Sequence, residues 1–220
     1  MRPVSVMILV AQVSFLLLVP VVFPPTSLAQ DIVLPPPQTE GGLGLFAALK
    51  KRSSVSGAAI SPAEVTLEEL STVLWAASGL NRGQTGWTVP MAEGLAPYVR
   101  VFVAGPGGVW LYDWADHKLV EISKDNVKAG IAAQAFVAKA WYSLIFVSDK
   151  KTAAGLGPGA PAADDFIQVL TGAMTQDVYL AAAALGLGAR YIHSMKIDRI
   201  REVLSLEPED YPVALMVLSR

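Results

Sequence analysis

Hydrophobic residues recur at helical spacing in four segments of the chain. Residues 67–77 place leucine, valine and alanine on one face, and residues 164–185 extend this pattern with many small residues in the second half. Residues 126–138 and 43–51 follow the same period. The pattern therefore predicts four amphipathic helices. In the helix at 43–51, Leu45, Phe46 and Leu49 form the expected buried side.

Other apolar runs have the character of strands. Residues 98–104 alternate, a GPGG turn follows, and residues 109–112 return, which predicts a hairpin. Residues 141–147 (WYSLIFV) are almost continuously apolar and predict a strand buried on both faces. Residues 190–195 and 213–218 predict two further strands. The Gly-, Pro- and Ala-rich residues 152–163 predict a flexible lid or surface loop.

Polar residues and glycines mark where the helices begin and end. Thr66 and Glu69 form a capping-box pattern in front of the helix at 67–77, and Gly79 is expected to end that helix in a left-handed conformation. Gly186 is expected to help end the helix at 164–185. Asp198 is the expected cap of a short helix at 199–204.

The first 29 residues predict a signal peptide. Arg2 precedes a nearly continuous apolar run over residues 6–23, prolines follow, and SLA at 27–29 fits the small-x-small pattern of cleavage sites. We expect cleavage after Ala29 and export of the mature chain to the periplasm or outside the cell. The alternative is a retained membrane anchor, because the apolar run approaches the roughly 20 residues of a spanning helix.

The mature chain divides into an arm and one domain. Residues 30–42 contain three consecutive prolines, which predict an extended arm lying on the domain or on a partner subunit. Residues 43–220 form the domain. The net charge is −2 and the chain has no cysteine. We therefore expect no nucleic-acid partner, no disulfide and no thiolate chemistry.

No catalytic constellation stands out in the sequence. We find no Ser-His-Asp order, no pair of carboxylates with an evident catalytic role and no cluster of metal ligands. The basic turn KKRSS at 50–54 has two interpretations: a solvated helix end, or a site for an anion.

Four segments together indicate a family. They are RSSVS at 52–56, LWAASGLNR at 74–82, PMAEGLAP at 90–97 and GAMTQDVYLAAAALGL at 172–187. They resemble the flavin-dependent nitroreductase family, above all the branch with the azoline-oxidising dehydrogenases of peptide biosynthesis. The second segment matches the family pattern throughout. Asp177 stands where the family has asparagine, and Met91 where serine is usual.

The resemblance implies a fold and a cofactor. It implies an α+β fold with a mixed, mostly antiparallel sheet flanked by helices, and a homodimer with flavin mononucleotide (FMN) at the subunit interface. Residues 172–185 are the candidate helix for dimer packing. The resemblance also assigns the cofactor-binding residues: Arg52 and Ser54 at the phosphate, Ser53 and Ser56 where the family has arginine, Pro90, Met91 and Ala92 beneath the flavin ring, and His193 and Ser194 facing its reactive nitrogen.

Two functions remain open at this stage. The first is an FMN-dependent oxidoreductase that passes hydride through flavin N5 to or from a small organic substrate, with NAD(P)H or another donor. No side chain is then expected to be catalytic, because the flavin carries the chemistry. The second is an exported, non-catalytic relative that keeps the fold as a binding or structural protein, since Ser53 and Ser56 each replace a charge.

Overall fold

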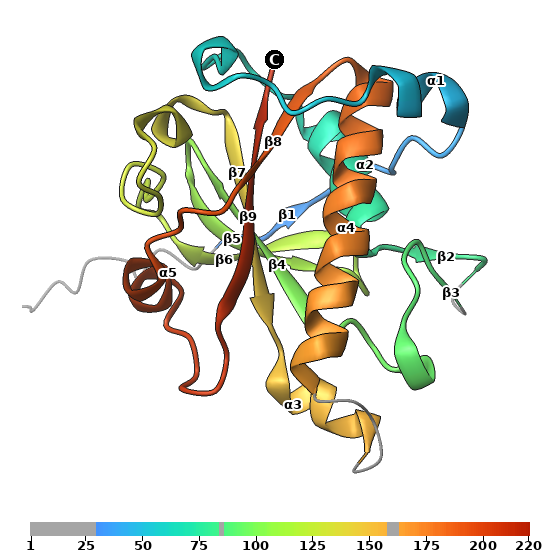
Figure 1. Ribbon diagram of the computed structural model, residues 1–220, viewed down its shortest axis with the longest axis vertical. Helices are drawn as coiled ribbons and strands as arrows, with labels where there is room; N and C mark the ends of the chain where they lie inside the picture. Colours follow the sequence, from blue (N-terminus) through green and yellow to red (C-terminus); the bar gives the residue numbers. More distant parts are fainter. Residues whose placement is uncertain (1–29, 84–85, 158–162) are drawn as a thin grey trace, which may run out of the picture.

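A computed structural model describes residues 30–83, 86–157 and 163–220 of the chain. The expected signal peptide and part of the loop expected at 152–163 lie outside these residues. Figure 1 shows a twisted sheet crossed on one side by a long helix.

One seven-stranded sheet forms the centre of the fold. Its strands lie in the order β1, β6, β5, β4, β7, β9, β8, and neighbouring strands pair antiparallel throughout. Their bounds are β1 Ile32–Val33, β4 Val99–Gly105, β5 Gly108–Asp113, β6 Lys118–Ser123, β7 Tyr142–Ser148, β8 Gly188–Ile192 and β9 Pro212–Ser219. A separate hairpin joins β2 Leu80–Asn81 to β3 Gly86–Trp87. The expected α+β class with a mostly antiparallel sheet is confirmed.

The strands with the clearest sequence patterns lie in the middle of the sheet. β4 and β5 form the predicted hairpin, with Phe102 opposite Leu111 and Gly105 opposite Gly108. β7 pairs with β4 on one side and β9 on the other, and Ser143 to Ser148 are all buried. Both faces of β7 are covered, which explains its continuous apolar run.

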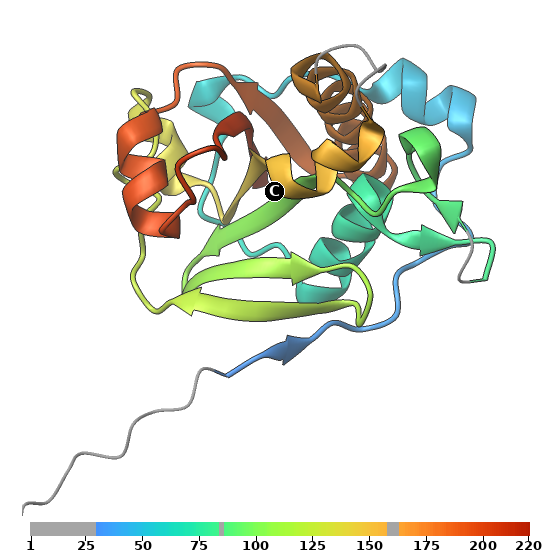
Figure 2. The same cartoon turned by 90° about the horizontal axis from the view of Figure 1, so that it is seen from below.

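Different elements cover the two faces of the sheet. On one face α2 Leu67–Ser78 and α4 Ala163–Leu185 pack together, with α1 Leu45–Lys51 beside α4. The other face carries α5 Ile197–Leu204 and an irregular segment at 124–141. Figures 1 and 2 show α4 and α5 well apart. A last short helix, α3 Lys150–Ala153, follows β7. Two apolar clusters, one on each face, hold the layers together.

The start and end of α2 follow from local chemistry. The Thr66 hydroxyl accepts the Glu69 N–H at 3.3 Å, and the Glu69 carboxylate accepts the Thr66 N–H at 2.9 Å, so the predicted capping box is confirmed. Gly79 does follow the helix, but its φ is −79°, so the expected left-handed conformation is wrong. A Cβ on Gly79 would lie 2.4 Å from the Trp75 side chain, so the close approach requires glycine.

The proline-rich arm lies on its own domain. Leu34 N–H donates to the His117 carbonyl at 3.2 Å, and Ser71 Oγ donates to the Pro35 carbonyl at 2.5 Å. His117 Nε2 lies 2.7 Å from Ser71 Oγ, and His117 Nδ1 lies 2.9 Å from the Tyr112 hydroxyl. Burial lowers the pKa of His117, which favours the neutral ring. These contacts fasten the arm across α2 and the β5–β6 turn.

The helix predicted at 126–138 is wrong. The segment forms turns and ends in a 3₁₀ helix at Ala135–Lys139. Lys128 is buried, and its ammonium donates to the carbonyls of Ala140 at 2.7 Å and Trp141 at 3.1 Å. The irregular backbone brings carbonyl groups to this charge while Val127 and Ile131 pack into the core. Tertiary packing has therefore overridden a weak helical pattern that contains Gly130.

Three smaller expectations also differ from the structure. The expected buried side of α1 is wrong: Leu45, Phe46 and Leu49 are 61%, 85% and 45% exposed, because α1 contacts the domain mainly through Ala48. Asp198 lies in the first turn of α5, whose cap position is Lys196, and makes no capping bond. The loop expected from residue 152 begins with the end of α3 and a 3₁₀ turn at Ala154–Leu156.

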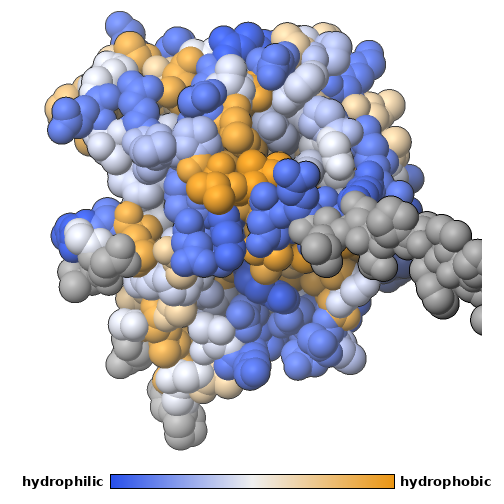
Figure 3. Space-filling model, turned by 180° about the vertical axis from the view of Figure 1, so that it is seen from behind, coloured by the Kyte–Doolittle hydropathy of each residue, from blue (hydrophilic) through white to orange (hydrophobic). Residues whose placement is uncertain are grey.

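The surface combines polar faces with a few exposed apolar side chains. The face turned away from the viewer of Figure 1 is largely hydrophilic, with an apolar area near its centre (Figure 3). Among the described helices, none is both long enough and apolar enough to cross a membrane.

Candidate cofactor site

The first candidate residue follows the end of α1. Arg52 takes the C-cap position after a last turn that contains Lys50 and Lys51. Its guanidinium carbon lies 5.4 Å from the centre of the Tyr179 ring of α4. A cation at this distance is attracted by the ring quadrupole. The structure therefore holds a positive charge at the junction of α1 and α4.

Tyr179 also fixes the chain after Arg52. Its hydroxyl lies 2.8 Å from Ser54 Oγ and accepts the Tyr191 N–H at 2.7 Å. Ser54 forms a parallel bridge with Ala189, at the start of β8, and Val55 N–H donates to the Ala189 carbonyl at 3.0 Å. Arg52 and Ser54 are thus held against α4 and β8 at once.

The two serines that replace family arginines lie beside this contact. Ser56 is exposed and caps the 3₁₀ turn Gly57–Ala59 by accepting the Ala59 N–H at 3.3 Å. Ser53 lines a small cavity of about 180 Å³ with Lys51 and Tyr179. The described lining offers an ammonium and hydroxyls but no carboxylate. This donor set fits a phosphate ester.

His193 and Ser194 follow the end of β8 and are exposed. Gln134 Nε2 donates to Ser194 Oγ at 2.7 Å, and Ala133 N–H donates to the Ser194 carbonyl at 3.0 Å. The hydrogen bonds among the described residues do not use the Ser194 N–H. The loop is therefore fixed through its other polar atoms, and this N–H remains available to a ligand.

Pro90, Met91 and Ala92 lie elsewhere. They connect β3 to a 3₁₀ turn at Ala92–Gly94, and Met91 and Ala92 pack partly against the core. They are absent from the lining of the cavity beside Ser53. In Figures 1 and 2 this segment, next to β3, and the loop that leads from β8 to α5 lie on opposite sides of α4.

Within one subunit the structure brings together only part of the predicted site. The segment at 52–56 meets the start of β8, and His193 and Ser194 follow its end, so the two groups are about 13 Å apart along the strand. The expected bed for the ring, Pro90 to Ala92, does not join them.

Sequence reasoning missed two residues of this region. Tyr179 contacts Arg52, Ser54 and Tyr191, yet in the sequence it was one position of the segment at 172–187 with no role assigned. Its phenol was the available signal, since a buried tyrosine hydroxyl needs a partner. Gln134, whose amide donates to Ser194, had no signal in the sequence. Lys51, which lines the small cavity, belongs to the basic turn at 50–54 that the sequence already indicated.

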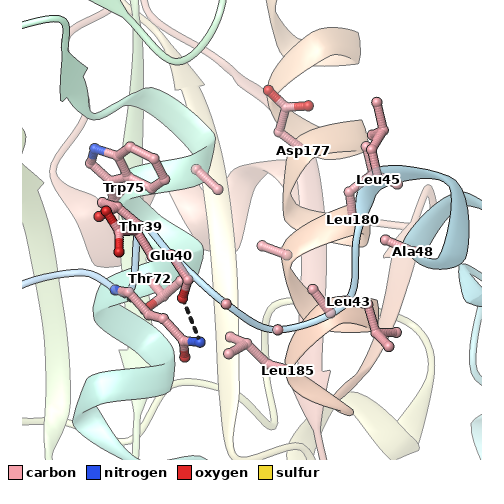
Figure 4. A pocket seen from close by; sticks show the side chains of 16 residues that line it. Thr39, Glu40, Leu43, Leu45, Ala48, Thr72, Trp75, Asp177, Leu180 and Leu185 are labelled. Atoms are coloured by element: carbon pink, nitrogen blue, oxygen red, sulfur yellow. Dashed lines mark hydrogen bonds between the residues drawn. The ribbon is translucent and has the colours of Figure 1, made fainter.

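Asp177 lies two residues before Tyr179, on a different side of α4, in a groove of about 270 Å³ between the arm, α1, α2 and α4 (Figure 4). Its neighbours there include Trp75, Leu180 and Leu185. Burial raises the pKa of its carboxyl to about 6. Among the described residues no hydrogen bond or ion pair compensates this carboxyl.

Comparison with known proteins assigns the chain to a family. Residues 49–219 match the model of the nitroreductase family. The family protein MJ1384 of Methanocaldococcus jannaschii is 33% identical over 182 residues, which cover 78% of this chain and 88% of the relative. The chain belongs to the nitroreductase family, whose members are oxidoreductases.

Solved structures agree with this assignment. A family protein from Ralstonia eutropha JMP134 superposes with a TM-score of 0.78 at 29% identity, covering 86% of this chain and 89% of that one. The Escherichia coli microcin synthetase McbBCD complex, solved with truncated pro-MccB17 bound, matches with a TM-score of 0.64 at 15% identity. That match covers 73% of this chain and 66% of the other, and at this identity it shows the fold alone.

Proposed function

We propose that the protein is an FMN-dependent oxidoreductase that transfers hydride to or from a small organic substrate. One observation carries the proposal: the Arg52, Ser54 and Tyr179 cluster lies at one end of β8 and the unused Ser194 N–H at the other. In this proposal the phosphate donors and the donor to the ring edge lie along one strand.

The chain's own residues have binding roles in this proposal. Arg52 and Lys51 supply charge to the phosphate, and Ser53 and Ser54 supply hydroxyls. Ser194 offers its N–H to the ring edge, and His193 flanks it. Flavin mononucleotide, when bound, supplies hydride transfer through N5. NAD(P)H or another reductant is the proposed electron donor.

A second copy of the chain completes the proposed site. Pro90, Met91 and Ala92 do not reach the β8 loop within one subunit, so we assign the ring bed to a homodimer partner. The candidate contact face carries the exposed side chains of Leu45, Phe46 and Leu49 on α1. Such an apolar face is typical of an interaction surface.

The absorbance spectrum of the purified mature protein tests the proposal. We expect a flavin spectrum as isolated or after addition of FMN, and bleaching of that spectrum by a chemical reductant. A colourless protein that does not bind added FMN would refute the proposal.

A non-catalytic role is the second candidate. It is favoured by Ser53 and Ser56, because each lacks the charge that the family places there. In that case FMN binds weakly or not at all, while the family fold is retained.

We also propose that the protein acts outside the cytoplasm after cleavage behind Ala29. The support is the sequence pattern of residues 1–29, with the membrane anchor as the alternative. N-terminal sequencing of the exported protein checks this: a chain beginning at Gln30 supports cleavage, and one beginning at Met1 supports the anchor.

A further inference from the structure

The groove of Figure 4 runs along one face of α4. The α4 residues that line it recur at the spacing of a single helix face: Asp177, Leu180, Ala181, Ala184 and Leu185. Asp177 and Leu185 are eight positions apart, so this stripe is about 12 Å long. The groove is therefore elongated, with a carboxylate at one end of the α4 stripe and an apolar side chain at the other.

The other walls of the groove come from the arm, α1 and α2. Residues 38–42 of the arm border it, and Leu43 and Leu45 line it at the start of α1. Trp75 lines it from α2, and its ring is fixed because Nε1 donates to the Leu80 carbonyl at 2.8 Å. The α4 stripe thus faces mainly apolar walls, which suit the apolar part of a ligand.

The charge of the groove is negative. Asp177 and Glu40 are the charged side chains among the described residues that line it, and no lysine, arginine or histidine belongs to that lining. Within the part of the chain that the structure describes, neither carboxylate has a hydrogen-bond or ion-pair partner. Glu40 is exposed, whereas Asp177 is half-buried beside apolar side chains. An uncompensated charge is costly in such a position, and a bound cation would remove that cost.

The charge at position 177 is a departure of this chain from the family pattern. Asparagine, which the family has there, matches aspartate in shape but carries no charge. The groove therefore differs from that pattern at this position by a negative charge. Such a change alters which ligand the groove accepts, because a carboxylate attracts a cation and repels an anion.

We infer that this groove is a binding site for an alkylammonium ion. The ammonium donates to the Asp177 carboxylate, and the alkyl chain lies along α4 towards Leu180 and Leu185. A primary ammonium suits the carboxylate because it combines a compact positive charge with three N–H donors. None of the predicted flavin-binding residues lines the groove, so this ligand site goes beyond the proposed function.

Three probes test the charge and the chain separately, by calorimetric titration at pH 8, where Asp177 is ionised. Octylammonium has both the cation and a long chain. Octanoate replaces the cation by an anion, and butylammonium shortens the chain. We expect octylammonium to bind saturably and the other two to bind at least tenfold more weakly. No saturable binding of octylammonium, or an equal affinity for either of the other probes, would overturn the inference.

Asp177→Asn provides the matched variant, because it removes the charge and keeps the shape. We expect its thermal unfolding midpoint to be no lower than that of the parent, and its affinity for octylammonium to fall at least tenfold. Asp165→Asn is the control and should keep the affinity, because Asp165 is exposed in the first turn of α4 and does not line the groove. A folded Asp177→Asn protein that binds octylammonium as tightly as the parent would contradict the inference.

A second copy of the chain is the other possible occupant, because Leu45 both lines the groove and belongs to the proposed contact face. Phe46→Asp distinguishes the two, since it places a charge on that face at a residue outside the groove lining. We expect the parent and this variant both to bind octylammonium. Binding by the variant but not by the parent would show that the partner subunit fills the groove, and the inference would be wrong.

Adding FMN separates this site from the proposed function. We expect the affinity for octylammonium to be the same with and without saturating FMN, because the two sites share no residue. Displacement of the probe by FMN would place it in the flavin site and rule out the inferred site. A protein that binds no FMN would refute the proposed function only.

Discussion

Tyr179 shows what a single residue contributes to this site and why the sequence did not reveal it. The RSSVS segment is contiguous, so its resemblance to a phosphate-binding motif could be read directly. The contact between Ser54 and Tyr179 joins residues 125 positions apart, and it exists only because α4 packs against β8. Local patterns could therefore predict the phosphate donors but not the side chain that holds them.

Arg52→Ala tests the phosphate contact. The Arg52 guanidinium lies 5.4 Å from the centre of the Tyr179 ring, and a hydrogen bond to a charged group contributes about 1.5–3 kcal/mol. We expect FMN affinity to fall about tenfold or more, measured by quenching of flavin fluorescence. Arg199→Ala is the control, because Arg199 lies on α5 and pairs with exposed Glu202. Equal affinities of Arg52→Ala and the parent would show that the phosphate is held elsewhere.

Asp177 makes stability depend on pH. Burial raises the pKa of this carboxyl to about 6, above its ordinary value, so folding favours the protonated form. The folded state therefore has its full stability below about pH 4, where this carboxyl is protonated in both the folded and the unfolded chain. Part of that stability is lost as pH rises through 6, where the folded chain must also ionise the carboxyl. Asp177→Asn cannot ionise. Because the group is only half-buried, we expect this variant to gain about 1 kcal/mol of unfolding free energy at pH 7.

Urea unfolding at pH 4.5 and pH 7 measures this effect. The difference between Asp177→Asn and the parent is expected at pH 7 and should largely disappear at pH 4.5. Asp125→Asn, in an exposed turn, is the control and should leave the unfolding free energy unchanged at both values. A constant difference between variant and parent at the two pH values would exclude ionisation of Asp177 as its cause.

At the scale of elements, prediction succeeded where local and tertiary preferences agree. α2 has a capping box and an apolar face, and the β4–β5 hairpin has alternation and a glycine-rich turn, so both were predicted from sequence. At 126–138 the apolar spacing resembled a helix, but Lys128 is buried against carbonyls. For α1 the spacing predicted a buried side at Leu45, Phe46 and Leu49, but in the part of the chain that the structure describes these side chains are exposed. Sequence periodicity does not reveal which surface an apolar face meets.

Thr66 tests how much the capping box stabilises α2. Thr66→Ala removes the acceptor for the Glu69 N–H and exposes the helix end to competition from water, so we expect a loss of about 1 kcal/mol of unfolding free energy. Thr66→Ser keeps the hydroxyl and should stay within a few tenths of the parent. Urea denaturation measures both. Equal losses in the two variants would assign the effect to the Thr66 methyl group instead.

At the scale of the whole molecule, the fold could be predicted but the assembly of the site could not. Four segments that resemble the nitroreductase family indicated both the family and its α+β sheet, and both are confirmed. The segments alone do not show that Pro90 to Ala92 and the loop at His193 lie on opposite sides of α4. This separation depends on how the helices pack, and it makes a second subunit necessary for the proposed site.

Phe46→Asp tests that second subunit. Phe46 is 85% exposed on α1, so the substitution leaves the fold of one subunit intact but places a charge in the proposed apolar contact. We expect the parent to be a dimer and the variant a monomer in size-exclusion chromatography with light scattering. FMN affinity should fall together with dimerisation, because the proposed site takes its ring bed from the partner. Ile197→Asp, at a partly exposed position of α5, should remain dimeric. A monomeric parent that binds FMN tightly would show that one subunit suffices and would overturn the shared site.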